Sequence, residues 1–180
     1  MVYFDNAATT ELSQYVKEQM CSAMEIFGNP SSLHMLGIDA EDIILLAKKS
    51  IANTLKCKPE EIIFTSGGTE SDNTAIFGVA QAMKRRGNRI VTTAFEHSAV
   101  LAPLKELEAE GFEVVYLKPD KCGSVSEQSF YDAIDEKTIL VTAMHINNET
   151  GAILPIDKIK SIIKSKKSPA LFHCDATQSF

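Results

Sequence analysis

The sequence lacks several features that would place it in a specialised class of protein. It has no run of eighteen apolar residues, so nothing in it predicts a membrane-spanning helix. Its first residues, MVYFD, lack the basic start and apolar core of a signal peptide. The formal net charge is −6 and no basic patch stands out, which argues against nucleic acid as a main partner. We therefore expect a globular protein that binds neither membrane nor nucleic acid.

The sequence also lacks any CxxC pair. Its four cysteines are scattered along the chain, at Cys21, Cys57, Cys122 and Cys174. This spacing predicts free thiols in a reducing compartment rather than a disulfide framework or a zinc site. Together with the missing signal peptide, it predicts a cytoplasmic location.

What the sequence does contain is an alternation of apolar runs with helical patterns. The chain has 180 residues, of which 44% are hydrophobic, enough to bury a core. Strands are predicted at 61–65, 89–93, 113–117, 138–144 and 170–174, and helices at 70–86, 99–110, 127–134 and 156–166. Runs such as IIF at 62–64 are apolar on both faces, as buried parallel strands are. The chain is therefore predicted to be α/β, a three-layer α/β/α sandwich with a mainly parallel sheet.

Two helices are expected before this alternation begins. Leu12, Val16, Met20 and Met24 fall on one helical face, and a second helix is expected at 39–55. We predict a terminal helix-and-loop segment at 1–35 and a larger domain at 36–180. No internal repeat or low-complexity linker divides the chain further.

The segment SGGTES at 66–71 lies between a predicted strand and a long helix. Its glycines let the backbone approach a ligand closely, and the free amides of a helix start favour an anion. A tight turn with a Ser or Thr cap would explain the same residues. A P-loop would need a lysine before the Ser or Thr, and none is present.

Three more polar segments come after predicted strands: EHS at 96–98, MHINNETG at 144–151 and DATQ at 175–178. His97 is able to act as an acid or base or to stack on a planar ligand, although a loop or helix-cap role is also open. Turn chemistry alone would explain the asparagines of the second segment. A zinc site built on His173, Cys174 and Asp175 is excluded because adjacent strand residues point to opposite faces.

All four segments are expected at the same edge of the sheet, where ligands of open α/β folds bind. They provide an anion cradle, an imidazole, an amide cluster and a carboxylate. This set fits a flat phosphorylated ring whose nitrogen needs a negative partner, and so predicts pyridoxal 5′-phosphate as the cofactor.

The order and residues of these segments resemble a known family. The resemblance rests on DNAATT at 5–10, FGNPSSLH at 27–34, TSGGTESDN at 65–73, EHSAV at 96–100, MHINNETG at 144–151 and DATQS at 175–179. They resemble the NifS/IscS group of cysteine desulfurases, more than the SufS branch, within the class V aminotransferases of fold-type I. The resemblance implies a pyridoxal-phosphate-dependent transferase-like major domain.

The resemblance also implies roles for individual residues. Gly68 and Thr69 would bind the cofactor phosphate, and His97 would stack on the ring and help to move protons. Asp175 would pair with the protonated ring nitrogen, while Gln178 and Asn148 would lie by the ring hydroxyl. Asn148, Ala8 and Thr9 would line the substrate side.

The implied activity is that of a cysteine desulfurase, which converts L-cysteine to L-alanine and holds the sulfur as an enzyme-bound persulfide. That sulfur would pass to an acceptor protein, such as an iron–sulfur scaffold, for cluster or thio-cofactor assembly. The intact family is homodimeric. Another class V aminotransferase, a selenocysteine lyase, or a non-catalytic fragment that binds a partner or a phosphate-bearing ligand remain alternatives.

Several elements of the family pattern have no match in this sequence. These are the Schiff-base lysine of a Ser-x-His-Lys segment, the persulfide cysteine and the substrate-binding arginine, and none of the four cysteines stands at a matching position. We therefore expect a domain truncated before its last strands and inactive alone. Two unpaired strands, at 61–65 and 170–174, would favour self-association.

Overall fold

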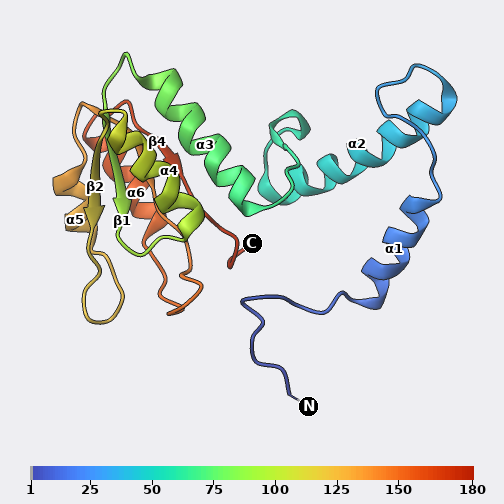
Figure 1. Cartoon of the computed structure of the whole chain (residues 1–180), viewed down its shortest axis with the longest axis horizontal. Helices are drawn as coiled ribbons and strands as arrows, with labels where there is room; N and C mark the ends of the chain where they lie inside the picture. The colour runs from blue at the N-terminus through green and yellow to red at the C-terminus, as the bar shows by residue number, and fades with distance from the viewer. Residues whose placement is uncertain (1) are drawn as a thin grey trace. The chain divides into compact units, whose positions relative to one another are not determined.

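The computed structural model describes residues 2–180, which form two compact units that meet in the sequence between Phe64 and Thr65 (Figure 1). The second unit carries the sheet and most of the predicted polar segments. The predicted division after residue 35, between a terminal segment and a cofactor-binding domain, stays a prediction.

The second unit alternates helices and strands as predicted. Its elements in chain order are α3 (Gly68–Met83), β1 (Arg89–Thr93), α4 (Ser98–Ala109), β2 (Glu113–Leu117), α5 (Glu127–Ala133), β3 (Thr138–Thr142), α6 (Ile156–Ser165) and β4 (Leu171–His173). The strands form one sheet in the order β2-β1-β3-β4, and all three pairings are parallel. The α/β prediction with a parallel sheet is confirmed.

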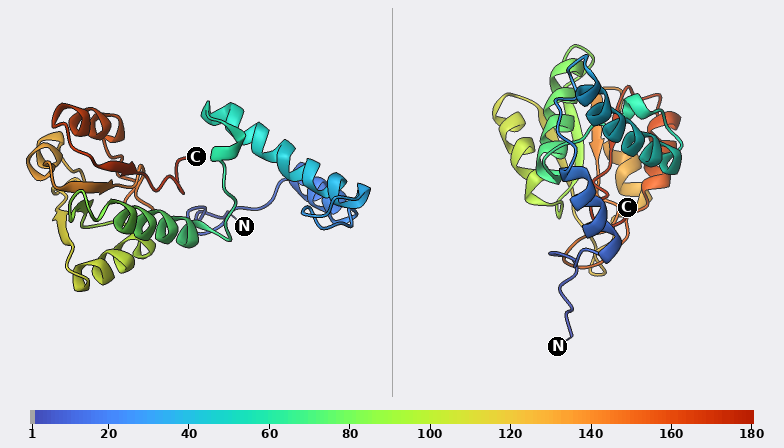
Figure 2. Two further views of the ribbon diagram at one scale, coloured as in Figure 1. Left: turned by 90° about the horizontal axis from the view of Figure 1, so that it is seen from above. Right: turned by 90° about the vertical axis from the view of Figure 1, so that its right-hand side faces the viewer.

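Two apolar cores cover the two faces of this sheet. Ile76 of α3 and Leu104 of α4 pack with Ile90 on one face, and Phe130 of α5 and Ile159 of α6 pack with Val141 on the other. The left view of Figure 2 shows these helix pairs on opposite sides of the strands. Every residue of β3 is buried, as expected for a central parallel strand. The unit is a three-layer sandwich.

The strand predicted at 61–65 is wrong. Pro59–Glu61 instead form a short 3₁₀ turn, η1, in which the Lys58 N–H donates to Glu61 Oε2 at 2.8 Å. The chain beyond η1 pairs with no strand among residues 2–180, and Ile63 is 79% exposed. A strand needs a hydrogen-bonded neighbour as well as an apolar run, so the edges of the described sheet are β2 and β4.

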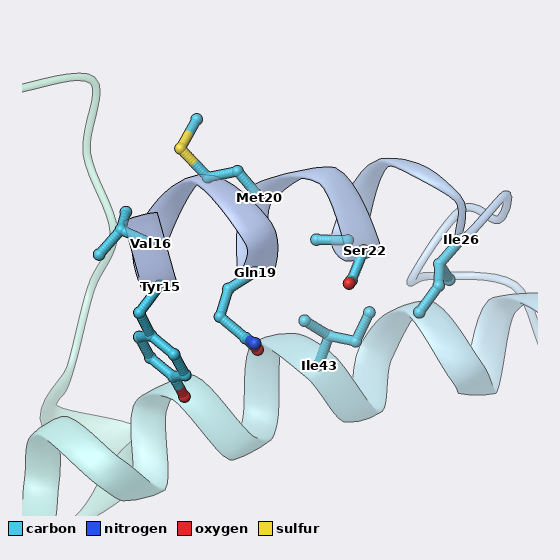
Figure 3. Close-up of a pocket in the computed structure, with 8 residues that line it drawn as sticks. Tyr15, Val16, Gln19, Met20, Ser22, Ile26 and Ile43 are labelled. Carbon is cyan, nitrogen blue, oxygen red and sulfur yellow. The ribbon is translucent and has the colours of Figure 1, made fainter. Parts of the chain in front are cut away.

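The first unit contains α1 (Gln14–Met24) and α2 (Met35–Leu55) and has little core. Between residues 2 and 64, the buried residues are only Gly37, Ala52 and Ile62. Tyr15 and Gln19 of α1 point toward α2, and together with Ile43 they line a shallow groove, while Met20 points away (Figure 3). The unit thus consists of helices with large exposed apolar side chains.

Neither unit contains a helix of the membrane-spanning kind. Within residues 2–180, no helix combines the length and the apolar character needed to cross a membrane.

Candidate functional site

The start of α3 is left without a side-chain cap. Gly67 occupies the N-cap position, and a Cβ built on it would meet nothing within 4 Å. The nearby carboxylate of Glu70 is engaged by Ser66, whose N–H and hydroxyl donate to Oε2 at 2.7 and 2.6 Å, and these bonds lower the pKa of Glu70. An uncapped helix start next to open space is suited to an anion because its first amides point outward.

This helix start approaches the segment that comes after β4. A Cβ added to Gly68 would lie 3.3 Å from the Thr177 hydroxyl, so only glycine fits without displacing it. The Thr177 N–H in turn donates to Asp175 Oδ1 at 3.0 Å. Gly68 and Asp175, far apart in sequence, therefore belong to one rim at the carboxyl ends of the strands.

His97 lies at the same rim, at the N-cap of α4. Its Nδ1 accepts from the Ala99 N–H at 3.1 Å, so a neutral imidazole carries its proton on Nε2. The helix-cap interpretation of His97 is confirmed, and it uses only one of the two ring nitrogens. Asn73 of α3 donates to the carbonyls of Thr69 (2.9 Å) and Ala99 (3.1 Å), which ties the first turns of α3 and α4 together.

Glu96, for which no separate role is predicted from the sequence, is a buried carboxylate that is 5% exposed. It accepts from the Thr93 hydroxyl, and its two oxygens lie 3.1 and 2.9 Å from the donating N–H of Met144. Burial raises the pKa of Glu96 to about 7, and the charge of Asp175 adds to this rise. Glu96 therefore fastens the loop of His97 to the end of β3. The sequence signal that could have identified it is its position three residues after the end of the buried strand β1.

Asn147 makes a second link between the same two loops. Its Nδ2 donates to the Phe95 carbonyl at 2.9 Å, and its Oδ1 accepts from the N–H groups of Glu149 (3.0 Å) and Thr150 (2.8 Å). Turn chemistry thus accounts for Asn147. Its neighbour Asn148 is exposed at this turn, and its predicted ligand role stays a prediction.

Asp175 is half-buried just beyond β4. Its carbonyl accepts from the His145 N–H at 2.9 Å, which continues the pairing of the chains beyond the two strands. Burial raises the pKa of the adjacent Cys174 to about 11, and the charges of Asp175 and Glu96 contribute. The carboxylate of Asp175 gives this part of the rim a negative character that suits a cationic group. Gln178 is partly buried three residues further on.

The remaining predicted residues, Ala8 and Thr9, belong to the first unit and are exposed. Both of their N–H groups donate to the Asp5 carbonyl, at 3.2 and 3.4 Å, in a tight turn. Their place on the substrate side stays a prediction.

A parallel α/β sheet with an uncapped helix start, a histidine and a carboxylate at its carboxyl edge is the arrangement of an α/β ligand-binding domain. The family model of aminotransferase class V matches residues 2–180, and the chain belongs to this family.

Within this family, the similarity is to cysteine desulfurases. Cysteine desulfurase IscS of Methanosarcina thermophila is 47% identical over 179 residues, which cover 99% of this chain and 44% of that protein. A solved NifS-like protein superimposes with a TM-score of 0.95 at 41% identity, over 99% of this chain and 49% of the other. SspA, solved in complex with cysteine, superimposes with a TM-score of 0.93 at 39% identity, over 100% of this chain and 52% of the SspA chain.

These comparisons confirm the resemblance to the NifS/IscS group. The chain spans about half the length of the curated relatives that it matches.

Proposed function

We propose that this chain supplies the cofactor-binding part of a pyridoxal-phosphate-dependent cysteine desulfurase. The enzyme would convert L-cysteine to L-alanine and pass the sulfur, held as a persulfide, to an acceptor protein such as an iron–sulfur scaffold. The observation that carries the proposal is the close approach of the uncapped start of α3 to the segment 175–178. The relative solved with cysteine supports cysteine as the substrate.

The residues at the rim fit pyridoxal phosphate by their chemistry. The amides of Gly68 and Thr69 suit the phosphate, since a Cβ at Gly68 would crowd the Thr177 hydroxyl and no side chain caps this helix start. His97 would stack on the ring, Asp175 would face the ring nitrogen, and Gln178 and Asn148 would face the ring hydroxyl. Asn148, Ala8 and Thr9 would line the substrate side.

Each of these side chains has a defined task in the proposed reaction. When bound, the cofactor supplies an electron sink for the pair left at the substrate Cα as its proton departs. Asp175 would hold a proton on the ring nitrogen, because a negative charge beside that nitrogen favours its protonated form. His97, fixed through Nδ1, presents Nε2 as the atom that moves a proton.

The chain alone is expected to be inactive. The sequence contains no Ser-x-His-Lys segment, and the thiol at the rim, Cys174, has a pKa raised to about 11, so its thiolate is scarce. With pyridoxal phosphate, L-cysteine and a reductant, we expect no sulfide release, and no single lysine labelled after borohydride reduction. Catalytic sulfide release, or fixation of the cofactor at one specific lysine, would contradict this.

The proposal extends to partners and location. We propose that the chain self-associates, as a homodimer in the intact enzyme. Two features favour this: the outer sides of β2 and β4 are unpaired in the described sheet, and α1 and α2 expose large apolar residues. A strictly monomeric chain in sedimentation experiments would argue against it.

All four cysteines are free, which supports a reducing, cytoplasmic location.

A further inference from the structure

We propose that Asp72 and His173 are positioning residues that set the spacing between the two ends of the cofactor site, the phosphate cradle of α3 and the ring-nitrogen partner Asp175. This inference rests on the proposed function. It assigns a role to a buried polar contact that the reaction itself does not use.

Asp72 lies about one turn into α3, just after the cradle residues Gly68 and Thr69. It is 5% exposed, and its Oδ1 lies 3.4 Å from Nε2 of His173. The contact joins the helix of the phosphate cradle to the last residue of β4. It forms an ion pair whenever the imidazole is protonated.

The other nitrogen of the His173 ring is also held. Nδ1 of His173 lies 2.8 Å from the hydroxyl of Thr142, a residue of β3 with no exposed surface. Contacts at both ring nitrogens leave the imidazole one orientation. The ring therefore connects β4 to β3 by a hydrogen bond and to α3 by a short polar contact, in addition to the apolar packing.

Asp175 comes two residues after His173. The parallel pairing continues through both, since the Ala143 N–H donates to the His173 carbonyl (3.1 Å) and the His145 N–H to the Asp175 carbonyl (2.9 Å). Side chains alternate along a paired chain, so Asp175 lies on the same side of the chain as His173. The Asp72–His173 contact thus connects the two ends of the site.

A buried polar contact of this kind contributes little net stability, because desolvation offsets most of its attraction. Apolar side chains would pack α3 on the sheet equally well. What the short contact between Asp72 and His173 adds is a defined position of the cradle relative to Asp175. A ligand that touches both ends benefits from that spacing, whereas a ligand that touches one end does not.

The test compares ligands that reach one end or both. Pyridoxine 5′-phosphate carries the ring and the phosphate but no aldehyde, so it forms no imine with surface lysines. Pyridoxine, which reaches only Asp175, and inorganic phosphate, which reaches only the cradle of α3, are the one-ended probes. For Asp72→Asn and His173→Gln, we expect the affinity for pyridoxine 5′-phosphate to fall by about tenfold, a usual coupling for residues in contact, while the affinities for both one-ended probes stay unchanged.

Asp135→Asn is the matched control, because it breaks an ion pair of the same unit, with Arg89, at the amino ends of the strands. It is expected to lower stability without changing the affinity for pyridoxine 5′-phosphate. Thr142→Val provides a milder variant that replaces the hydroxyl by a methyl group of similar size, and it should weaken binding of pyridoxine 5′-phosphate alone.

Unchanged affinity for pyridoxine 5′-phosphate in folded Asp72→Asn and His173→Gln would overturn the inference, as would equal losses for all three probes. If the unsubstituted chain binds no pyridoxine 5′-phosphate, the proposed function fails. The contact is then tested by a double-mutant cycle, which compares the free energies of unfolding of the two single variants of Asp72 and His173 with that of the double variant. Strictly additive effects would overturn the inference there too.

Discussion

At the scale of single residues, Glu96 has the most unusual environment. Its carboxylate is buried and accepts hydrogen bonds from Thr93 and Met144, and the nearby His173 lowers its pKa only slightly when it is charged. Burial is the main cause of its raised pKa, and the hydrogen bonds offset that cause only in part. The loop that carries His97 is thus held by a group that titrates near neutrality.

Glu96 should make stability depend on pH. The folded pKa of about 7 lies above the ordinary value of 4.5, so between these values the folded state keeps a proton that the unfolded state releases. The free energy of unfolding should therefore fall as pH rises through this window, by about 3 kcal/mol at most. Denaturant unfolding across the window should show this fall, and Glu96→Gln, which is neutral throughout, should remove it. Parallel curves for the two proteins would contradict the prediction.

Gly68 and Gly78 form a matched pair on α3. A Cβ at Gly68 would press on the Thr177 hydroxyl at 3.3 Å, whereas a Cβ at Gly78 would meet nothing within 4 Å. Gly78→Ala should raise the free energy of unfolding by about 0.5–1 kcal/mol, since alanine loses less entropy in a helix, and it should leave binding of pyridoxine 5′-phosphate intact. Gly68→Ala should weaken that binding in calorimetric titration. Equal effects of both substitutions on binding would contradict the role of Gly68.

Sequence reasoning found the residues that carry a local signature and missed those whose role depends on packing. The glycines at the start of α3 and the histidine after β1 stand out because recognisable turn and strand patterns flank them. Asp72 has the pattern of a polar residue on a helix surface, and Asn147 that of a turn former. Their burial is decided by β4 and by the loop of Phe95, which nothing nearby in sequence indicates.

At the scale of elements, β1 and β2 were predicted to the residue because each combines an apolar run with clear boundaries. The run at 62–64 is also apolar, but it has no neighbour to pair with among the described residues. Strand formation depends on a distant partner, and a local pattern carries no information about one. The helices were predicted to within a few residues, because their period and caps are local.

Arg89 joins several elements at the amino edge of the sheet. Its guanidinium donates to both oxygens of Glu113, at 3.0 and 2.7 Å, and lies 2.5 Å from Asp135. Lysine keeps the charge but cannot bind both carboxylates in this forked way. Arg89→Lys should lower the free energy of unfolding by about 1 kcal/mol, because the pairs are partly exposed. Chemical denaturation tests this, with Lys137→Arg as the control, and an unchanged midpoint would refute it.

At the scale of the whole molecule, the two units differ in how much they bury. Residues 65–180 contain two apolar cores, whereas residues 2–64 bury only three residues. Local stability depends on buried apolar contact, so the first unit should open far more often than the second. Hydrogen exchange should show amides of α1 and α2 exchanging about tenfold or more faster than those of β1 and β3. Equal protection in both units would contradict this description of the first one.

One rim of the second unit is proposed to hold a phosphorylated pyridine ring between the start of α3 and Asp175. Equilibrium dialysis of the chain with pyridoxine 5′-phosphate tests this binding, with Asp175→Asn as the variant and Asp157→Asn, on α6, as the control. We predict saturable binding that weakens by about tenfold or more in Asp175→Asn, the value of a charged hydrogen bond, and is unchanged in Asp157→Asn. Absence of saturable binding, or equal affinity for Asp175→Asn and the unsubstituted chain, would show that the rim does not hold such a ring.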